Sequence, residues 1–257
     1  MATLFQNARQ VAHYASYRPS YPDALFKCIS AHTVSNHTVA DVGCGTGQAT
    51  ASLLRYFDQV IGVDTSESQI KAARQEHPSL KFIVGQESKL PFAEKSLSCV
   101  AVAQAAHWFD LPAFYREVDR VLESKGVLAI WCYGLPQFPS NAELQRMIIR
   151  DLYEDTLGSY WDERRRLVEH MYKDLATIDN YHDNYKTKSI EEKGFSIERE
   201  VSSHEIGGYI RSWSGYTRYC EHHEVSEGSE DDPLRPVEAL LENQNNPIKM
   251  VAPVRLL

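Results

Sequence analysis

The sequence lacks features that mark several common classes of protein. Its 257 residues carry 27 Lys or Arg against 35 Asp or Glu, for a net charge of −8, and the one basic cluster is Arg164–Arg166. Nucleic-acid-binding proteins usually present a basic face, so DNA and RNA are disfavoured as partners. We expect the Arg164–Arg166 run to lie on the solvated face of a helix.

Long apolar stretches are absent as well. The longest apolar run, around residues 99–106, is far shorter than a membrane-spanning helix. Residues 1–14 contain no apolar core of the kind that a signal peptide requires. These two absences lead us to expect a cytoplasmic protein that does not enter a membrane.

Paired cysteines are missing too. The five cysteines are odd in number and form no C-x-x-C pair; they are Cys28, Cys44, Cys99, Cys132 and Cys220. This spacing favours free thiols in a reducing compartment over disulfides or a zinc site. The adjacent Glu and His at residues 221–224 cannot all turn to one ion from a helix face. We therefore expect no bound metal, and we interpret residues 221–232 as a solvated loop.

What is present is the alternation of an α/β protein. The composition, 43% hydrophobic and 24% charged, is that of an ordinary globular protein, and the length fits one large domain. Short apolar runs alternate with helical patterns up to residue 131, which indicates a mostly parallel sheet. The expected strands are residues 39–42, 59–64, 80–85, 98–103, 127–131, 195–201 and 248–256. Pro253 argues against a central hydrogen-bonded position within the last of these.

The stretch at residues 39–50 predicts a buried strand, a tight turn and the start of a helix. Gly43, Gly45 and Gly47 stand at alternate positions, and Asp41 precedes the first of them by two residues. Glycine adopts positive φ at little cost and lets a ligand approach the backbone closely. The helix that follows points free N–H groups at the turn. The third glycine comes one residue earlier than in the dinucleotide fingerprint G-x-G-x-x-G.

A second acidic residue strengthens this prediction. Asp64 ends the second expected strand, 21 residues after Gly43. A carboxylate at the tip of that strand accepts hydrogen bonds from the hydroxyl groups of a ribose. The turn and Asp64 together therefore predict a ligand that contains a nucleoside.

Three segments resemble one enzyme family. The pattern D-x-G-x-G-x-G at residues 41–47 resembles motif I of the class I S-adenosylmethionine (SAM) methyltransferases. Residues 86–92 resemble the family's motif II, which holds the adenine, although Gln86 stands where the family often has Asp. The sequence Q-A-A-H-W-F-D at residues 104–110 resembles the type-11-like small-molecule methyltransferases, in particular the branch related to trans-aconitate methyltransferase.

The resemblance implies an α/β, Rossmann-like fold. Its sheet would have seven strands, mostly parallel, in the order 3-2-1-4-5-7-6, with helices on both faces. A single methyltransferase domain would cover residues 1–257, with a helical cap insertion at residues 136–188 between strands five and six. The implied cofactor is SAM, which leaves as S-adenosylhomocysteine, and no obligate protein partner is implied.

The motifs and the resemblance together give candidate site residues. The cofactor-binding candidates are Tyr17, Arg18, Asp41, Gly43, Cys44, Gly45, Gly47, Asp64, Thr65, Gln86, Glu87 and Gln104. The substrate-binding candidates are the aromatic residues Trp108, Tyr133, Trp161 and Trp213. His107 is the candidate catalytic residue, because it follows the fourth strand and faces the expected cleft. Arg18 offers a planar fork to a carboxylate of the substrate or of SAM.

The expected chemistry is methyl transfer to a small molecule. The sulfonium of SAM is already a good leaving group, so the protein mainly supplies alignment. A carboxylate acceptor needs no base, whereas a hydroxyl or amine would lose a proton, and His107 is the best-placed base. No second base stands in the motif loops, which favours a carboxylate. The alternatives are a neutral acceptor with His107 as base, a non-catalytic SAM-binding regulator and a nicotinamide-dependent dehydrogenase.

Overall fold

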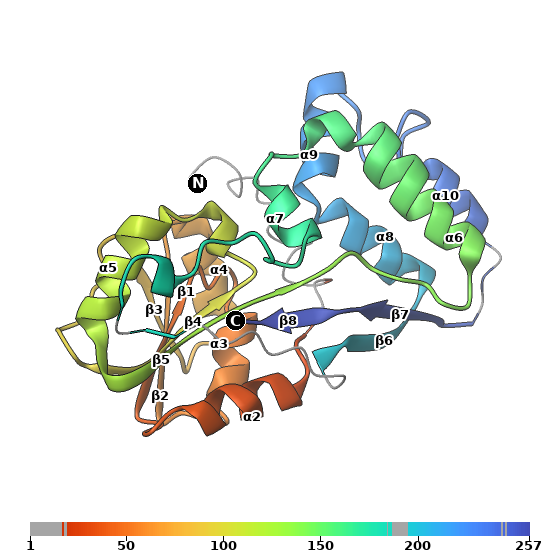
Figure 1. Ribbon diagram of the computed structural model, residues 1–257. Helices are drawn as coiled ribbons and strands as arrows, with labels where there is room; N and C mark the ends of the chain where they lie inside the picture. The colour runs from red at the N-terminus through yellow and green to blue at the C-terminus, as the bar shows by residue number, and fades with distance from the viewer. Residues whose placement is uncertain (1–16, 18–19, 184, 187–194, 243, 245) are drawn as a thin grey trace.

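The computed structural model describes residue 17 and residues 20–183, 185–186, 195–242, 244 and 246–257. Within these residues, six strands form the main sheet, in the order β3-β2-β1-β4-β5-β8, and β6 and β7 form a second pair. Figure 1 shows the helices that cover the main sheet and a separate group of helices to one side of it.

Five parallel strands make up most of the main sheet. They are β1 (Thr38–Val42), β2 (Gln59–Asp64), β3 (Lys81–Val84), β4 (Leu97–Ala103) and β5 (Leu122–Tyr133). Six of the seven residues of β4 are buried, as expected for a strand that is covered on both faces. The order β3-β2-β1-β4-β5 confirms the predicted Rossmann-like α/β fold.

Helices cover both faces of this sheet. They are α2 (Asp23–His32), α3 (Gln48–Leu53), α4 (Glu67–Glu76) and α5 (Leu111–Val121), with the short 3₁₀-helix η1 (Ala106–Trp108) before α5. Leu25 and Phe26 of α2 pack with Trp131 of β5 in one core, and Phe114 of α5 belongs to the core on the other face. Asp110 caps α5, since its Oδ1 accepts a hydrogen bond of 3.2 Å from the N–H of Ala113.

The last strand differs from the prediction. It is divided into β7 (Ile248–Ala252), which pairs antiparallel with β6 (Ile197–Val201), and β8 (Val254–Leu256), which pairs antiparallel with β5. Pro253 separates the two parts because a proline has no N–H to give to a ladder. The described chain therefore has six strands in one sheet and two in another instead of one sheet of seven.

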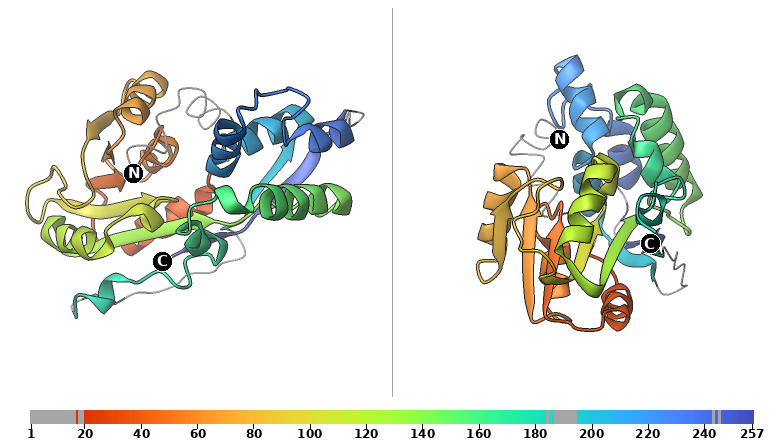
Figure 2. Two further views of the ribbon diagram at one scale, coloured as in Figure 1. Left: turned by 90° about the horizontal axis from the view of Figure 1, so that it is seen from above. Right: turned by 60° about the vertical axis from the view of Figure 1, so that its left-hand side comes forward.

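Some of the helices between β5 and β6 pack together with the helices that follow β6. The first set is α6 (Ala142–Arg146), the π-helical η2 (Met147–Thr156), the 3₁₀-helix η3 (Gly158–Tyr160), α7 (Arg165–Glu169) and the 3₁₀-helix η4 (Ile178–Asn180). The second set is α8 (Ser203–Arg211), α9 (Ser214–His223) and α10 (Arg235–Leu241). Helices α6, η2, α8, α9 and α10, hereafter the helical group, share a hydrophobic core and lie beside the main sheet (Figure 2).

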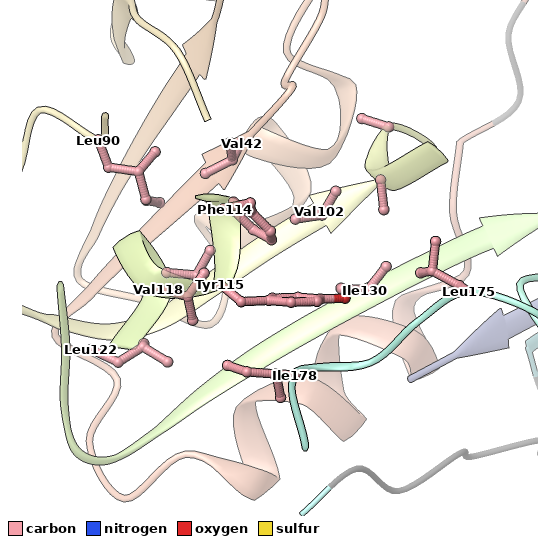
Figure 3. Packing of buried hydrophobic residues seen from close by; sticks show 14 of the residues in the cluster. Val42, Leu90, Val102, Phe114, Tyr115, Val118, Leu122, Ile130, Leu175 and Ile178 are labelled. Carbon is pink, nitrogen blue, oxygen red and sulfur yellow. The ribbon is translucent and has the colours of Figure 1, made fainter. Parts of the chain in front are cut away.

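The segment from α7 to η4 does not belong to the helical group and packs along the main sheet. Leu175 and Ile178 pack there against Tyr115 of α5 and Ile130 of β5, as Figure 3 shows. The hydroxyl of Tyr115 donates a hydrogen bond of 2.6 Å to the carbonyl oxygen of Ala176. Residues 165–183 therefore connect the helical group to the core of the sheet.

The acidic segment at residues 221–232 is exposed over most of its length, as expected, and differs from the expectation at its two ends. Helix α9 continues to His223, and Asp232 is buried. Asp232 accepts hydrogen bonds from the hydroxyl of Tyr216 (2.9 Å) and from a guanidinium nitrogen of Arg211 (3.2 Å). This buried network holds the segment against α8, because an ionised carboxylate in the interior requires such partners.

The cysteines agree with the sequence expectation. All five cysteines are free thiols. No helix in the described part of the chain combines the length and the apolar composition that crossing a bilayer requires. The described residues also contain no cluster of three or more His, Cys, Asp or Glu side chains that could hold a metal ion.

Candidate functional site

The glycine turn after β1 has the backbone that its sequence predicts. Gly43, Gly45 and Gly47 have φ angles of 73°, 56° and 90°, in the region that favours glycine. The N–H groups of Gly43 and Cys44 donate to the carbonyl oxygen of Val63, at 2.7 and 3.1 Å. The side chain of Cys44 is buried in a small core with Phe82, so this residue offers the turn its backbone.

Gly43 is required for a second reason. A Cβ atom at this position would lie 2.6 Å from the Cβ of Ala105 and 3.2 Å from the ring of Phe109. The turn after β1 and the turn after β4 are therefore in direct contact. This contact brings motif I and the segment at residues 104–110 into one site, as their order along the sheet predicts.

Asp41 lies below the turn as a buried carboxyl group. Its Oδ2 accepts a hydrogen bond of 2.6 Å from the hydroxyl of Thr50, whereas its Oδ1 has no partner in the described part of the protein. Burial raises the pKa of Asp41 to about 7, because removal of water disfavours the charged form. A cationic ligand at the turn would reverse this effect.

Two further buried polar atoms near the same turn have no partner among the described residues. They are the hydroxyl of Thr46 and Oε1 of Gln69, which lies 4.0 Å from the position of a Cβ on Gly45. Buried polar groups almost always have a hydrogen-bond partner, so unpaired atoms gathered around one turn make it a candidate place for a ligand. Sequence reasoning missed Thr46 and Gln69, because neither matches a motif position with a side-chain role.

Asp64, at the tip of β2, lies next to the turn. Its carboxylate accepts hydrogen bonds from the N–H groups of Gly45 (3.0 Å) and Ser66 (2.8 Å). Burial raises its pKa, and these backbone donors, together with the N–H of Thr65, act in the opposite direction. Glu87 raises the pKa further, which places a second carboxylate close to the first. Gln86 is the first residue of a turn, in which its carbonyl oxygen accepts a hydrogen bond from the N–H of Lys89. The side chain of Gln86 is exposed.

Gln104 connects the ends of β4 and β5. Its amide nitrogen donates to the carbonyl oxygen of Tyr133 (3.2 Å), and its amide oxygen accepts from the N–H of Tyr133 (2.9 Å). Gln104 also has a φ angle of 54°, which is unusual for a residue with a side chain. Both polar atoms of the Gln104 side chain therefore bind the backbone of Tyr133. The ring of Tyr133 packs near Tyr21 in the core.

His107 is buried in η1, in the turn after β4, and is uncharged. Its Nδ1 lies 2.8 Å from the hydroxyl of Tyr172. Burial lowers its pKa to about 3, and the positive charges of Arg165 and Arg164 contribute to the shift. A histidine with this pKa is neutral at pH 7 and is a weak base, so its environment does not suit the proton abstraction that a neutral acceptor would require.

Two arginines at the start of α7, Arg164 at its N-cap and Arg165 as its first residue, lie near this histidine. The guanidinium of Arg164 lies 4.5 Å from the ring centre of Trp108 and forms an ion pair of 2.8 Å with Asp162. Arg165 is partly buried, donates to the hydroxyl of Tyr153 (3.3 Å) and lies 5.5 Å from the ring centre of Trp161. The expectation that the whole Arg164–Arg166 run faces solvent is therefore wrong for Arg165.

The remaining candidates lie in or against the helical group. The rings of Trp161 and Trp213 are 5.9 Å apart, and Trp213 is fully buried. The hydroxyl of Tyr17 lies 2.8 Å from Nε2 of His204, on α8. Arg18 lies outside the described residues. The structure thus gathers Asp41, the turn, Asp64 and residues 104–108 at the sheet, and gathers the two tryptophans across from them.

Comparison with known proteins agrees with this arrangement. Residues 40–130 match a family described as a methyltransferase domain. A protein of Dictyostelium discoideum that is named as a methyltransferase is 35% identical over 81% of this chain and 76% of its own. A protein of Saccharomyces cerevisiae that is named as an S-adenosylmethionine-dependent methyltransferase is 27% identical over 88% of this chain and 82% of its own.

A solved structure extends the agreement to nearly the whole fold. A type II methyltransferase from Anaeromyxobacter dehalogenans superposes with a TM-score of 0.75 at 27% identity, over 94% of this chain and 97% of that one. The fold and the site define a Rossmann-like enzyme with a nucleoside-type cofactor. The chain belongs to the class I SAM-dependent methyltransferases. This assignment excludes the dehydrogenase and the non-catalytic regulator.

The residues at the turn fit SAM. The cofactor carries an ammonium and a sulfonium, and the unpaired Oδ1 of Asp41 and the carboxylates of Asp64 and Glu87 provide negative charge there. The unpaired oxygens of Thr46 and Gln69 add hydrogen-bond acceptors. When bound, SAM supplies a methyl group that is activated by the positive charge on sulfur.

Proposed function

We propose that this enzyme transfers the methyl group of SAM to a carboxylate oxygen of a small organic acid. One observation carries the proposal: the segment next to the glycine turn holds a neutral histidine and two nearby cations. His107 has a pKa of about 3, and Arg164 and Arg165 lower it by their positive charge. Such surroundings attract an anion and offer little help to an acceptor that must first lose a proton.

In the proposed reaction, one oxygen of the acceptor carboxylate attacks the methyl carbon in line with the carbon–sulfur bond. The carbon–oxygen bond forms as the carbon–sulfur bond breaks, and the electron pair of the broken bond stays on sulfur. No proton is transferred. The opposite charges of the two reactants cancel, so a site that excludes water favours the step, and the protein's main contribution is to align the two reactants.

The roles of the residues follow from their positions. We propose that Asp41, Thr46 and Gln69, with the backbone of Gly43, Cys44, Gly45 and Gly47, hold the methionine end of SAM. Asp64, Thr65, Gln86 and Glu87 would hold the ribose and adenine. Trp108 and Arg165 would contact the acceptor, and Gln104 and Tyr133 would fix the ends of β4 and β5 between the two ligands.

We further propose that the helical group, with residues 136–188 only as far as Tyr172, acts as a cap over the carboxyl ends of the strands, because Leu175 and Ile178 pack on the face of the sheet instead. Trp161 and Trp213 would shape the wall of that cap from its interior. Tyr17 would fasten the chain before β1 to the cap, because its ring packs on Gly208 of α8. The proposed reaction requires no obligate protein partner, nucleic acid or membrane.

The direct test is a substrate panel. S-adenosylhomocysteine formation would be measured with SAM and a series of mono-, di- and tricarboxylates, with trans-aconitate as the first probe. The corresponding amides and alcohols serve as matched controls. We expect turnover with one or more acids and none with their amides. Turnover confined to the alcohols or to amines would contradict the proposal.

The variant His107→Ala separates the two kinds of acceptor. A carboxylate needs no base, so we expect kcat to fall by less than about threefold, whereas loss of a general base costs about 10²–10⁴-fold. The kcat of the wild-type enzyme should also be independent of pH between 6 and 9, because the pKa of His107 near 3 lies outside that range. A large loss of kcat would restore His107 as a base.

A further inference from the structure

A second buried side chain, Tyr172, is positioned by the fold to control His107. Its hydroxyl is the hydrogen-bond partner of Nδ1 of His107, at a distance of 2.8 Å. Tyr172 and His107 are 1% and 5% exposed, so water does not compete for this bond. The two residues are 65 positions apart in sequence, and their contact links the turn after β4 to the segment after α7.

The backbone around Tyr172 is strained. Met171 and Tyr172 have φ angles of 53° and 55°, and two consecutive non-glycine residues in this region are rare. Such a conformation persists where the surrounding structure fixes it, and it is concentrated at functional sites. The N–H of Met171 donates to the carbonyl oxygen of Val168, and that of Tyr172 donates to Leu167, at 2.8 and 2.7 Å. This strained turn directs the phenol ring towards η1.

The direction of the hydrogen bond follows from the partners of the buried hydroxyl. His107 is neutral and therefore has one N–H, at either Nδ1 or Nε2. Burial raises the pKa of Tyr172, so the phenol keeps its proton. Among the described residues, Nδ1 of His107 is the hydrogen-bond partner of this hydroxyl, so the phenol proton is donated to Nδ1. Nδ1 of His107 then accepts, and its N–H lies at Nε2.

We propose that Tyr172 is a positioning residue that holds His107 in the tautomer with the proton on Nε2, so that His107 donates a hydrogen bond to the acceptor. This inference rests on the proposed function, and it adds the group that binds the carboxylate oxygen that does not attack. The charged groups that act on His107 are Arg165, Arg164 and Asp162. Together they would form a site with a fixed neutral donor and cations for one carboxylate.

The role of a donor differs measurably from the role of a base. A hydrogen bond to the oxygen that does not attack is present both before and during methyl transfer. Its loss therefore raises the KM for the acceptor and leaves kcat almost unchanged. Loss of a base would lower kcat instead, with a dependence on pH.

The first experiment reads the tautomer directly. ¹⁵N nuclear magnetic resonance of the wild-type protein with labelled histidine, with S-adenosylhomocysteine bound, reports the protonation of each ring nitrogen. We expect a protonated Nε2 and an unprotonated Nδ1 in His107, with both signals constant from pH 8 to pH 5.5. A proton on Nδ1, or titration within that range, would overturn the proposal. This measurement needs no acceptor and no variant.

The second experiment uses the matched pair Tyr172→Phe and Tyr115→Phe. Each variant removes one buried tyrosine hydroxyl that links residues 165–183 to the main sheet, but only that of Tyr172 reaches His107. With the acid that the panel identifies, we expect Tyr172→Phe to raise the acceptor KM about tenfold, with kcat within about twofold. Tyr115→Phe should leave both constants unchanged. Equal effects of the two variants, or a lower kcat at constant KM, would overturn the proposal.

The two experiments separate this inference from the proposed function. If no acid in the panel accepts a methyl group, the proposed function fails, and with it the contact between His107 and a carboxylate. The tautomer set by Tyr172 would still be decided by the ¹⁵N signals. If acids are methylated but Nδ1 carries the proton, the proposed function stands and this inference is wrong.

Discussion

The two sides of the proposed site are built in different ways. On the cofactor side, the turn at residues 43–47 and the tip of β2 present backbone groups and carboxylates that lie within 25 residues of one another in sequence. On the acceptor side, Trp108, Arg165 and Tyr172 come from separate elements and meet through tertiary packing. The cofactor side therefore depends on local backbone geometry, and the acceptor side depends on how the helical group and residues 165–183 pack on the sheet.

The largest effect that we expect from this difference is at Gly43. The variant Gly43→Ala would place a Cβ 2.6 Å from that of Ala105, on a backbone with φ of 73°. Overpacking and strain of this kind cost ~3 kcal/mol of folding free energy. We expect the turn to move to relieve them, and a displaced turn to bind SAM about 100-fold more weakly. Isothermal titration with SAM would measure it, and a melting curve would show whether the variant is folded.

Gly228→Ala is the matched control for this variant. Gly228 has a similar φ of 77°, but no atom lies within 4 Å of the position of its Cβ. It shares the backbone strain without the clash, and it is not in the proposed site. We expect its SAM affinity to equal that of the wild-type protein. Equal losses in both variants would mean that general destabilisation of the protein, and not the contact with Ala105, lowers the SAM affinity.

On the acceptor side, we expect the next largest effect at Arg165. The variant Arg165→Gln removes a positive charge beside His107, and a charge-assisted hydrogen bond contributes ~1.5–3 kcal/mol. We expect the KM for the acid to rise by about 10- to 100-fold while SAM affinity stays constant. The pKa of His107 should rise, because one of the charges that lower it is gone.

Arg166→Gln provides the control at the adjacent position. Arg166 is exposed, so its replacement removes the same charge from the protein without altering the surroundings of His107. Steady-state kinetics with varied acid and saturating SAM would compare the two. Should both variants raise the KM equally, general attraction of anions by the helix, and not a contact of Arg165, would explain the effect.

The contrast between the two sides also explains what could be predicted from the sequence. The glycine turn and Asp64 were predictable because each depends on a short segment and on the regular geometry of a parallel sheet, whereas the strand order was implied by the resemblance to the family. The division of the last strand was indicated by Pro253, whose missing N–H interrupts the ladder. These features are local, so their residues can be read in order along the chain.

Other features were not predictable because they depend on burial and on distant partners. Arg165 gave no clear signal, because Trp161, whose ring its guanidinium approaches, lies outside α7. The bond between Tyr172 and His107 gave none, since the strained turn at Met171 contains no glycine. The burial of Asp232 at the end of the acidic segment gave no signal either, because sequence alone does not reveal that Asp232 meets Arg211 in the interior.

The smallest expected effect concerns Asp41, and it tests whether the cofactor side recognises charge. Burial raises the pKa of Asp41 from 3.8 to about 7, so the folded protein holds this proton more tightly than the unfolded chain does. Without ligand, this group therefore makes the protein less stable as the pH rises from about 4 to 7. A bound ammonium favours the ionised form, so SAM should bind more tightly once Asp41 loses its proton.

For a single group with a pKa near 7, the ionised fraction rises about tenfold between pH 6 and pH 8. We expect the SAM affinity of the wild-type protein to rise by the same factor, and the affinity of Asp41→Asn to change little over that range. Asp64 remains in both proteins, so its own titration cancels in the comparison. An unchanged slope in Asp41→Asn would show that Asp41 does not face the cofactor's charge, and the turn would then recognise SAM through its backbone alone.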